Sequence, residues 1–152
     1  MIQLIIFDYG RTLYDRESSQ LFPEVHALIP ALASKYQLAI VSVSSSADEQ
    51  KRINLLKEHG LLEYFASIQF TPNPAEKFAL YNTLLKQLQR KPPQVAVVDD
   101  YIVRGVAWGN RVGATTVWFR NGKFSHILPT DETGQPDYAI RSLSELNDIF
   151  LA

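Results

Sequence analysis

The N-terminal segment QLIIFDYGRTLY, residues 3–14, joins a continuous apolar run to a polar turn. The run Gln3–Phe7 is short, contains two isoleucines and shows no alternation of polar and apolar residues. Such a run is typical of a strand buried on both faces of a parallel sheet. Asp8 follows it directly. The segment therefore predicts a buried strand with a carboxylate at its carboxyl end.

The same kind of run recurs along the chain, separated by longer amphipathic stretches, which is the pattern of parallel strands joined by crossover helices. The further predicted strands are Leu38–Val43, Ser67–Phe70, Gln94–Val98, Thr115–Phe119 and a short sixth at Tyr138–Ile140. We expect an α/β fold with a three-layer, doubly wound, mostly parallel sheet and helices on both faces. Since no linker or internal repeat interrupts the pattern, residues 1–152 are expected to form one domain.

Helix boundaries are marked by capping residues. The sequence Ser46-Ala47-Asp48-Glu49 predicts a capping box, and Asn73 followed by Pro74 predicts the start of the next helix. Pro30 should kink or delay the helix around residues 24–35. Gly105 and Gly109 weaken the helix expected after residue 100. Residues 120–135 are predicted to be turn and loop, with room for a short hairpin.

Composition limits the classes of function. The chain has 152 residues, 46% of them hydrophobic, and 15 basic residues against 16 acidic ones, so it can bury a core and carries no overall field for nucleic acid or anionic membranes. It has no cysteine, which excludes disulfides and thiol chemistry. Asp8 interrupts the first apolar run too early for a signal peptide or a membrane span. By default, we expect a cytoplasmic protein.

Polar residues follow several of the predicted strands. Asp8, Ser42 and the pair Asp99-Asp100 stand at strand ends, and Lys77 falls in the first turn of a helix. In open α/β sheets, ligands bind outside the carboxyl ends of the strands, so these side chains are expected to converge. Clustered carboxylates repel one another unless they share a cation or a proton, and Mg²⁺ is the natural cation for oxygen ligands.

The order of these motifs resembles that of the haloacid dehalogenase-like (HAD) hydrolases: an aspartate nucleophile, then Ser or Thr, then Lys, then an acidic pair. Residues 5–15, IIFDYGRTLYD, are similar to the family's first motif, an apolar strand followed by Asp-x-Asp-Gly-Thr-Leu. The second and fourth motifs resemble Leu38–Ser42 and Val95–Asp100. The segments Arg111–Trp118 and Asp137–Leu146 are similar to the parts of the family that follow. Receiver domains use the same residue types in a different order.

The resemblance implies a role for each site residue. Asp8 would be the nucleophile, Ser42 and Lys77 would assist catalysis and bind the phosphoryl group of a phosphorylated substrate, and Mg²⁺ would be held by Asp8, the carbonyl of Gly10 and Asp100. Asp99 would be a further ligand or would support the others. The residues alone leave simpler interpretations open, namely a turn aspartate at each acidic position, a helix-capping serine and a solvated surface lysine.

The motifs are degenerate at three positions. Gly10 replaces the family's second aspartate, which is the general acid and base of its phosphatases, and Gly105 replaces an aspartate beyond Asp100. Arg11 replaces a glycine and is expected either to bind a substrate anion or to crowd the site. Losing a positioned acid or base costs about 10² to 10⁴ in rate.

The spacing of the motifs bears on access to the site. The intervals from Thr12 to Ser42 and from Ser42 to Lys77 are each used up by one helix with its connections, so the sequence predicts a capless member. Such an open site suits a macromolecular phosphoester or closure by an oligomeric partner. We expect a slow or specialised Mg²⁺-dependent phosphatase. The alternatives are a catalytically silent binding domain and a metal-independent hydrolase.

Overall fold

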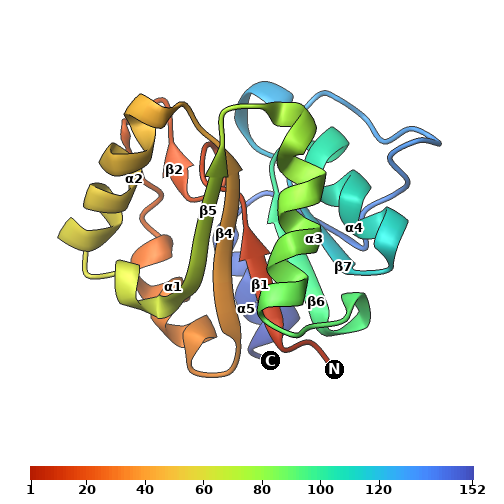
Figure 1. Cartoon of the computed structure of the whole chain (residues 1–152), viewed down its shortest axis with the longest axis horizontal. Coiled ribbons are helices and arrows are strands. Elements are labelled where there is room, and N and C mark those ends of the chain that lie inside the picture. The colour runs from red at the N-terminus through yellow and green to blue at the C-terminus, as the bar shows by residue number, and fades with distance from the viewer.

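A six-stranded parallel sheet forms the centre of the computed structural model, which describes residues 1–152 (Figure 1). Its strand order is β5-β4-β1-β6-β7-β8. The strands are β1 (Leu4–Phe7), β4 (Gln37–Val43), β5 (Phe65–Thr71), β6 (Val95–Asp99), β7 (Thr115–Phe119) and β8 (Tyr138–Ile140). Every predicted strand is present, including the short sixth one.

Helices cover both faces of this sheet, because alternate strand residues point to opposite sides. Ile5 and Phe7 of β1 pack in a cluster with α1 (Val25–Ala33), α5 (Leu146–Phe150) and Leu56 of α2 (Ser46–Glu58). Leu4 and Ile6 pack on the other face against α3 (Lys77–Gln87) and α4 (Ala107–Val112). The predicted three-layer α/β architecture is confirmed.

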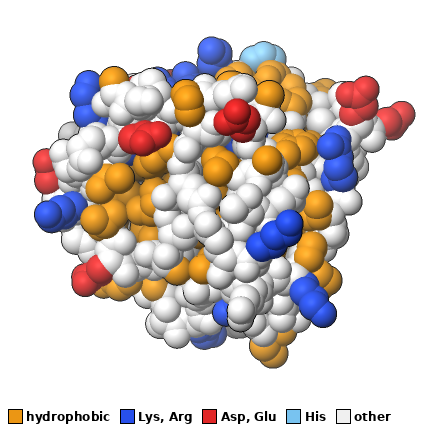
Figure 2. All heavy atoms as spheres, viewed as in Figure 1, with side chains coloured by type: hydrophobic (Ala, Val, Ile, Leu, Met, Phe, Trp, Pro, Cys, Tyr) orange, Lys and Arg blue, Asp and Glu red, His pale blue; other side chains and the backbone are white.

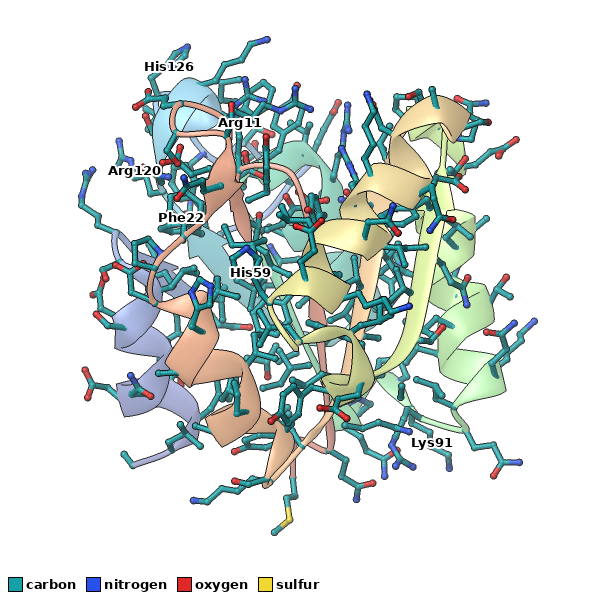
Figure 3. All side chains as sticks on the ribbon, turned by 90° about the vertical axis from the view of Figure 1, so that its left-hand side faces the viewer. Arg11, Phe22, His59, Lys91, Arg120 and His126 are labelled. Carbon is teal, nitrogen blue, oxygen red and sulfur yellow. The ribbon has the colours of Figure 1, made fainter.

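Strand β1 lies at the centre of the sheet, between β4 and β6, and pairs with both in parallel. The chain moves outward from β1 through β4 to β5, and then crosses to β6 on the other side of β1. The order of the strands therefore reverses next to β1, which is where ligand sites form in such sheets. In Figure 3, Arg11 lies at the carboxyl end of the sheet and Lys91 at the opposite end.

The structure corrects the cap expected for α2 and decides one of the two effects expected of Pro30. The N-cap of α2 is Ser45, whose hydroxyl accepts a hydrogen bond from the Asp48 backbone N–H at 3.3 Å, whereas Ser46 is the first helical residue. Ser44, Ser45 and Ser46 are consecutive serines, so the sequence does not identify the capping one, and Ser45 has the extended backbone that a cap requires. Helix α1 begins at Val25 and runs through Pro30 to Ala33, so the proline does not delay the start of the helix.

Three further segments were predicted incompletely. A hairpin of β2 (Tyr14–Asp15) and β3 (Gln20–Leu21) follows the first motif and was not expected. The chain after Asp100 begins as a π-helix, Ile102–Val106, before α4. Residues 120–135 form no hairpin and contain only turns and a 3₁₀ helix. The 3₁₀ helices are Leu62–Tyr64, Pro74–Glu76, Pro92–Gln94, Gly122–Phe124 and Leu143–Glu145.

The surface carries charges of both signs. On the face shown in Figure 2, basic and acidic side chains are interspersed and do not gather in a patch of one sign. None of the helices combines the length and the hydrophobicity that crossing a membrane requires.

Candidate functional site

Three carboxylates meet at the carboxyl ends of the two neighbouring strands β1 and β6. One carboxylate oxygen from each of Asp8, Asp99 and Asp100 lies within 4.8 Å of the others, and all three residues are buried. Asp8 comes directly after β1, its backbone N–H donates to the carbonyl of Val98 at 3.0 Å, and β6 ends at Asp99. The parallel pairing of the strands therefore creates the cluster.

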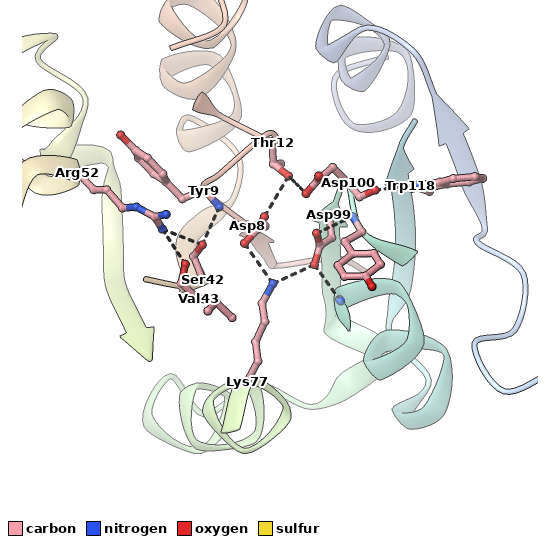
Figure 4. Close-up of polar contacts among 12 residues, drawn as sticks. Asp8, Tyr9, Thr12, Ser42, Val43, Arg52, Lys77, Asp99, Asp100 and Trp118 are labelled. Atoms are coloured by element: carbon pink, nitrogen blue, oxygen red, sulfur yellow. Dashed lines mark hydrogen bonds and ion pairs between the residues drawn. The ribbon is translucent and has the colours of Figure 1, made fainter. Parts of the chain in front are cut away.

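Lys77 joins two of these carboxylates. Its ammonium donates to Asp8 Oδ1 at 3.1 Å and to Asp99 Oδ2 at 3.0 Å, and its side chain is 1% exposed (Figure 4). Burial alone would lower the pKa of Lys77, but the two carboxylates raise it well above its ordinary value. Burial would raise the pKa of Asp8, but the charge of Lys77 and nearby hydrogen bonds lower it overall. Both groups are therefore charged at neutral pH.

Asp99 uses its carboxylate to hold its surroundings in place. Besides Lys77, it accepts hydrogen bonds from the backbone N–H groups of Tyr101, at 3.0 Å, and Gly105, at 2.9 Å. Gly105 is glycine for a steric reason, since a Cβ there would lie 2.7 Å from Asp99 Oδ2. A carboxylate side chain at position 105 would therefore not fit. Asp99 is the residue of this segment that hydrogen-bonds the Lys77 ammonium.

Asp100 keeps one carboxylate oxygen without a partner. Oδ1 accepts a hydrogen bond from Thr12 Oγ1 at 3.2 Å, while Oδ2 is buried and has no hydrogen-bond partner. Burial, followed by the charges of Asp99 and Asp8, raises the pKa of Asp100 to about 10. Asp100 Oδ2 can therefore accept a ligand, and the oxygens around it are of the kind that Mg²⁺ prefers. A divalent cation bound there would take the place of the proton on the Asp100 carboxyl group.

Thr12 and Ser42 complete the inner polar shell. Thr12 Oγ1 lies between Asp100 and Asp8 Oδ2, which it reaches at 3.5 Å. Ser42 Oγ accepts bonds from the Tyr9 N–H at 3.4 Å and from Arg52 at 3.1 Å. Although burial raises the pKa of Asp8, a hydrogen bond from Ser42 is one of the causes that lower it. We did not single out Thr12 from the sequence, although its position four residues after Asp8 in the first motif was an available signal.

A cavity of about 90 Å³ opens onto these groups. Four arginines line it, namely Arg11, Arg16, Arg52 and Arg104, and none of them forms an ion pair with a carboxylate of the chain. Only Arg11 was expected here. Its left-handed backbone, with φ of 61°, is unfavourable for a residue with a side chain, and its guanidinium lies 5.7 Å from the ring centre of Phe124.

The other three arginines could not be singled out from the sequence. Arg16 lies in the unexpected hairpin, Arg52 is one of several charged residues on α2, and Arg104 lies in the π-helix. Nothing in their local sequence distinguishes them from surface residues. Their common feature is three-dimensional, since all of them face the cavity of Asp8.

Gly10 borders the same cavity, and its position is open. A Cβ placed on Gly10 would meet no atom closer than 3.8 Å, and its backbone is outside the left-handed region. The nearest atoms would belong to the guanidinium groups of Arg16 and Arg52. The structure thus brings Asp8, Gly10, Arg11, Ser42, Lys77, Asp99 and Asp100, the site residues expected from the sequence, to one place.

The chain is similar in sequence and in fold to known phosphatases and hydrolases. Glyceraldehyde 3-phosphate phosphatase from Methanopyrus kandleri is 30% identical over 78 residues, which make up 51% of this chain and 32% of the relative, so the chain spans about a third of that protein. A HAD phosphatase from Thermococcus onnurineus superposes with a TM-score of 0.66 at 27% identity, covering 86% of this chain and 58% of the other.

A structure of higher similarity in fold but lower identity is the putative HAD hydrolase YfnB from Bacillus subtilis, which was solved bound to magnesium. Its TM-score is 0.78 at 16% identity, with 99% of each chain covered. The family model for haloacid dehalogenase-like hydrolases matches residues 1–119. The chain therefore belongs to the family of haloacid dehalogenase-like hydrolases.

Proposed function

We propose that this protein is a Mg²⁺-dependent phosphohydrolase with Asp8 as its nucleophile. The observation that carries the proposal is the environment of Asp8, which is ionised, lines a polar cavity and accepts a hydrogen bond from Lys77 at 3.1 Å. An ionised carboxylate in a fixed position is the nucleophile that an aspartyl-phosphate mechanism requires.

The neighbouring residues would divide the remaining work. A carboxylate oxygen of Asp8 would attack phosphorus, and the bond from phosphorus to the leaving oxygen would break. Lys77 and the Ser42 hydroxyl would bind the phosphoryl oxygens, whose charge they partly neutralise. Water would then attack the aspartyl-phosphate, which releases phosphate and restores the Asp8 carboxylate. Asp99 would position Lys77, because its other hydrogen bonds come from the backbone of Tyr101 and Gly105.

A magnesium ion fits the opposite side of the cluster. Asp8, Asp100 and the backbone carbonyl of Gly10 would hold it, and Thr12 already bridges the two carboxylates. Bound there, the ion would neutralise the charge of the phosphoryl group and orient it towards Asp8. We assign Asp99 to the lysine, since both of its oxygens already accept hydrogen bonds.

The class of substrate follows from the family and the charge of the site. The relatives from M. kandleri and T. onnurineus are named as phosphatases. The cavity of this chain is lined by four arginines without ion pairs and by Lys77, which suits an anionic substrate. A phosphorylated compound is therefore the proposed substrate.

Hydrolysis of an aryl phosphate in millimolar Mg²⁺ tests the proposal. We expect turnover by the parent protein and a loss of at least about 10³-fold in Asp8→Asn, which keeps the shape of the side chain but not its charge. Asp15→Asn is the matched control, because Asp15 lies in β2 and does not line the cavity. If parent and Asp8→Asn are equally inactive while both are folded, the protein is better described as a catalytically silent binding domain of the same fold.

A further inference from the structure

Two arginine side chains converge beside the backbone of Gly10. Nη2 of Arg16 and Nη2 of Arg52 each lie 3.8 Å from the point where a Cβ of Gly10 would stand. Neither guanidinium forms an ion pair, and Arg16 makes no hydrogen bond within the chain. Burial lowers the pKa of Arg52 most, and the charge of Arg16 lowers it further, whereas the charges of Asp8 and Asp48 raise it. The two guanidinium groups thus present positive charge beside Gly10 without a carboxylate in direct contact.

Arg52 is already oriented for this role. Its Nη1 donates to Ser42 Oγ and to the carbonyl of Val43, both at 3.1 Å, and its guanidinium lies 4.8 Å from the ring centre of Tyr9 (Figure 4). These contacts leave Nη2 free and fix the plane of the group. A preoriented guanidinium binds an oxyanion at a lower cost in conformational entropy.

The same two arginines border two cavities. The cavity of Asp8 measures about 90 Å³. A second one of about 400 Å³ lies between the β2–β3 hairpin and α2, lined by residues that include Tyr14, Leu55, Arg16 and Arg52. A phosphoryl group bound at Asp8 would occupy the first cavity. Since Arg16 and Arg52 line both cavities, a substrate that extends from the first into the second would contact them.

The atoms closest to the Cβ position of Gly10, in the cavity of Asp8, belong to guanidinium groups and not to a carboxylic acid. No histidine, glutamate or cysteine lines this cavity, and these are residues that often transfer protons at neutral pH. Guanidinium groups do not release their protons, and Lys77 is held by two carboxylates. Asp100 and Tyr101 also line the cavity, but Asp100 would give up its proton on binding a cation, so a leaving group that departs as an anion suits the arginines beside Gly10 best.

We propose that Arg16 and Arg52 form a subsite for an anionic leaving group, so that the substrate is a phosphoric anhydride, either a phosphoanhydride or an acyl phosphate. Asp8 attacks phosphorus, the bond between phosphorus and the bridging oxygen breaks, and its electron pair leaves on that oxygen. The product departs as a phosphate or carboxylate anion and needs no proton. This inference rests on the proposed phosphohydrolase function, since it names the substrate class of that site.

Binding of non-hydrolysable probes tests the subsite independently of catalysis. We would measure, by calorimetry in millimolar Mg²⁺, the Kd of methylenebisphosphonate, which mimics a phosphoanhydride, and of phosphonoacetate, which carries the carboxylate that an acyl phosphate releases. Methylphosphonate, with one anionic group, is the reference ligand. We call methylenebisphosphonate and phosphonoacetate, which each carry two anionic groups, the two-headed probes. The parent protein should bind at least one of them about tenfold or more tightly than methylphosphonate. A larger gain in affinity for methylenebisphosphonate would indicate a phosphoanhydride substrate, and a larger gain for phosphonoacetate would indicate an acyl phosphate.

The variant Arg16→Gln should remove this gain and change the Kd of methylphosphonate by less than about twofold. Lys57→Gln is the control, because Lys57 is an exposed residue of α2 that lines neither cavity, and it removes the same charge. Equal affinities for one-headed and two-headed probes in the parent would overturn the inference. So would an equal loss for all probes in Arg16→Gln.

Kinetics separate this inference from the proposed function. Acetyl phosphate or inorganic pyrophosphate should be hydrolysed faster than glycerol phosphate in terms of kcat/KM, and Arg16→Gln should reduce that preference by about tenfold. If an aryl phosphate is hydrolysed through Asp8 but neither anhydride is preferred to glycerol phosphate, the subsite is wrong and the phosphohydrolase stands. If the two-headed probes bind more tightly but no phosphate compound is hydrolysed, the phosphohydrolase is wrong and the anion subsite stands.

Discussion

The ammonium of Lys77 donates a hydrogen bond to Asp8 Oδ1 at 3.1 Å, although 69 positions separate the two residues in the chain. Lys77 begins α3, where a positive charge opposes the helix dipole, and it is buried. Such a placement is unfavourable unless carboxylates compensate the charge, as Asp8 and Asp99 do here. The ion pair therefore connects α3 to Asp8 and offsets the cost of burying the ammonium.

Removing this ammonium should destabilise the protein strongly. Lys77→Met keeps most of the volume but leaves two buried carboxylates uncompensated, so we expect the free energy of unfolding to fall by about 3 to 5 kcal/mol in urea denaturation. Lys86→Met, in the exposed last turn of the same helix, should change it by less than about 0.5 kcal/mol. Adding Asp8→Asn to Lys77→Met should recover part of the loss. If Lys77→Met were as stable as Lys86→Met, the ion pairs assigned to Lys77 would be contradicted.

The pKa of Asp100 makes stability depend on pH in a defined direction. Without a cation, folded Asp100 keeps its proton up to about pH 10, whereas the unfolded chain loses it near pH 4. The folded state then binds more protons between these values, so its contribution lowers the free energy of unfolding as pH rises from about 4 towards 10. Thermal melts in EDTA should show this decline, and Asp100→Asn should flatten it.

Magnesium should reverse the trend, because binding at Asp100 displaces the proton. We expect millimolar Mg²⁺ to raise the Tm of the parent more at pH 8.5 than at pH 6, and to leave Asp100→Asn almost unchanged. Titration calorimetry in two buffers of different ionisation enthalpy should reveal the released proton. Heats that are independent of the buffer, together with a Tm that ignores Mg²⁺, would argue that the carboxylates serve structure alone.

Gly105 should tolerate no side chain. In Gly105→Ala, the new Cβ would lie 2.7 Å from Asp99 Oδ2, which holds Lys77, so we expect a loss of about 1 to 3 kcal/mol in urea denaturation. Gly10→Ala is the matched control, since its Cβ would meet nothing closer than 3.8 Å. A loss of similar size in both variants would mean that the packing around Asp99 does not explain the glycine.

Some features of the site were predictable from sequence because they follow from local patterns. The apolar runs before Asp8 and Asp99 identify strands, and the parallel arrangement brings their ends together. The β2–β3 hairpin has strands of two residues each, too short to show a period, so neither it nor Arg16 was predicted. Arg52 looks like any charged residue of an exposed helix, and only the packing of α2 turns it towards Ser42. Distant contacts of this kind leave no mark in the local sequence.

The open space at Gly10 allows the missing carboxylate to be restored. Its backbone is outside the left-handed region and its Cβ position is clear, so Gly10→Asp should fold with nearly the stability of the parent. The new carboxylate would lie beside Arg16 and Arg52. This carboxylate would compete with an anionic leaving group for the two arginines. In its protonated form, it would supply a proton to a leaving group that departs as an alcohol.

Gly10→Asp should therefore change the choice of substrate in both directions. Hydrolysis of glycerol phosphate, whose leaving oxygen needs a proton, should rise by as much as about 10². Affinity for methylenebisphosphonate should fall at the same time, because the carboxylate pairs with the two arginines. Gly10→Asn is the control, since it has the same size and neither charge nor proton to transfer, and it should not accelerate the alkyl ester. The role assigned to position 10 fails if a folded Gly10→Asp variant hydrolyses aryl phosphate through Asp8 while its rate on glycerol phosphate equals that of Gly10→Asn.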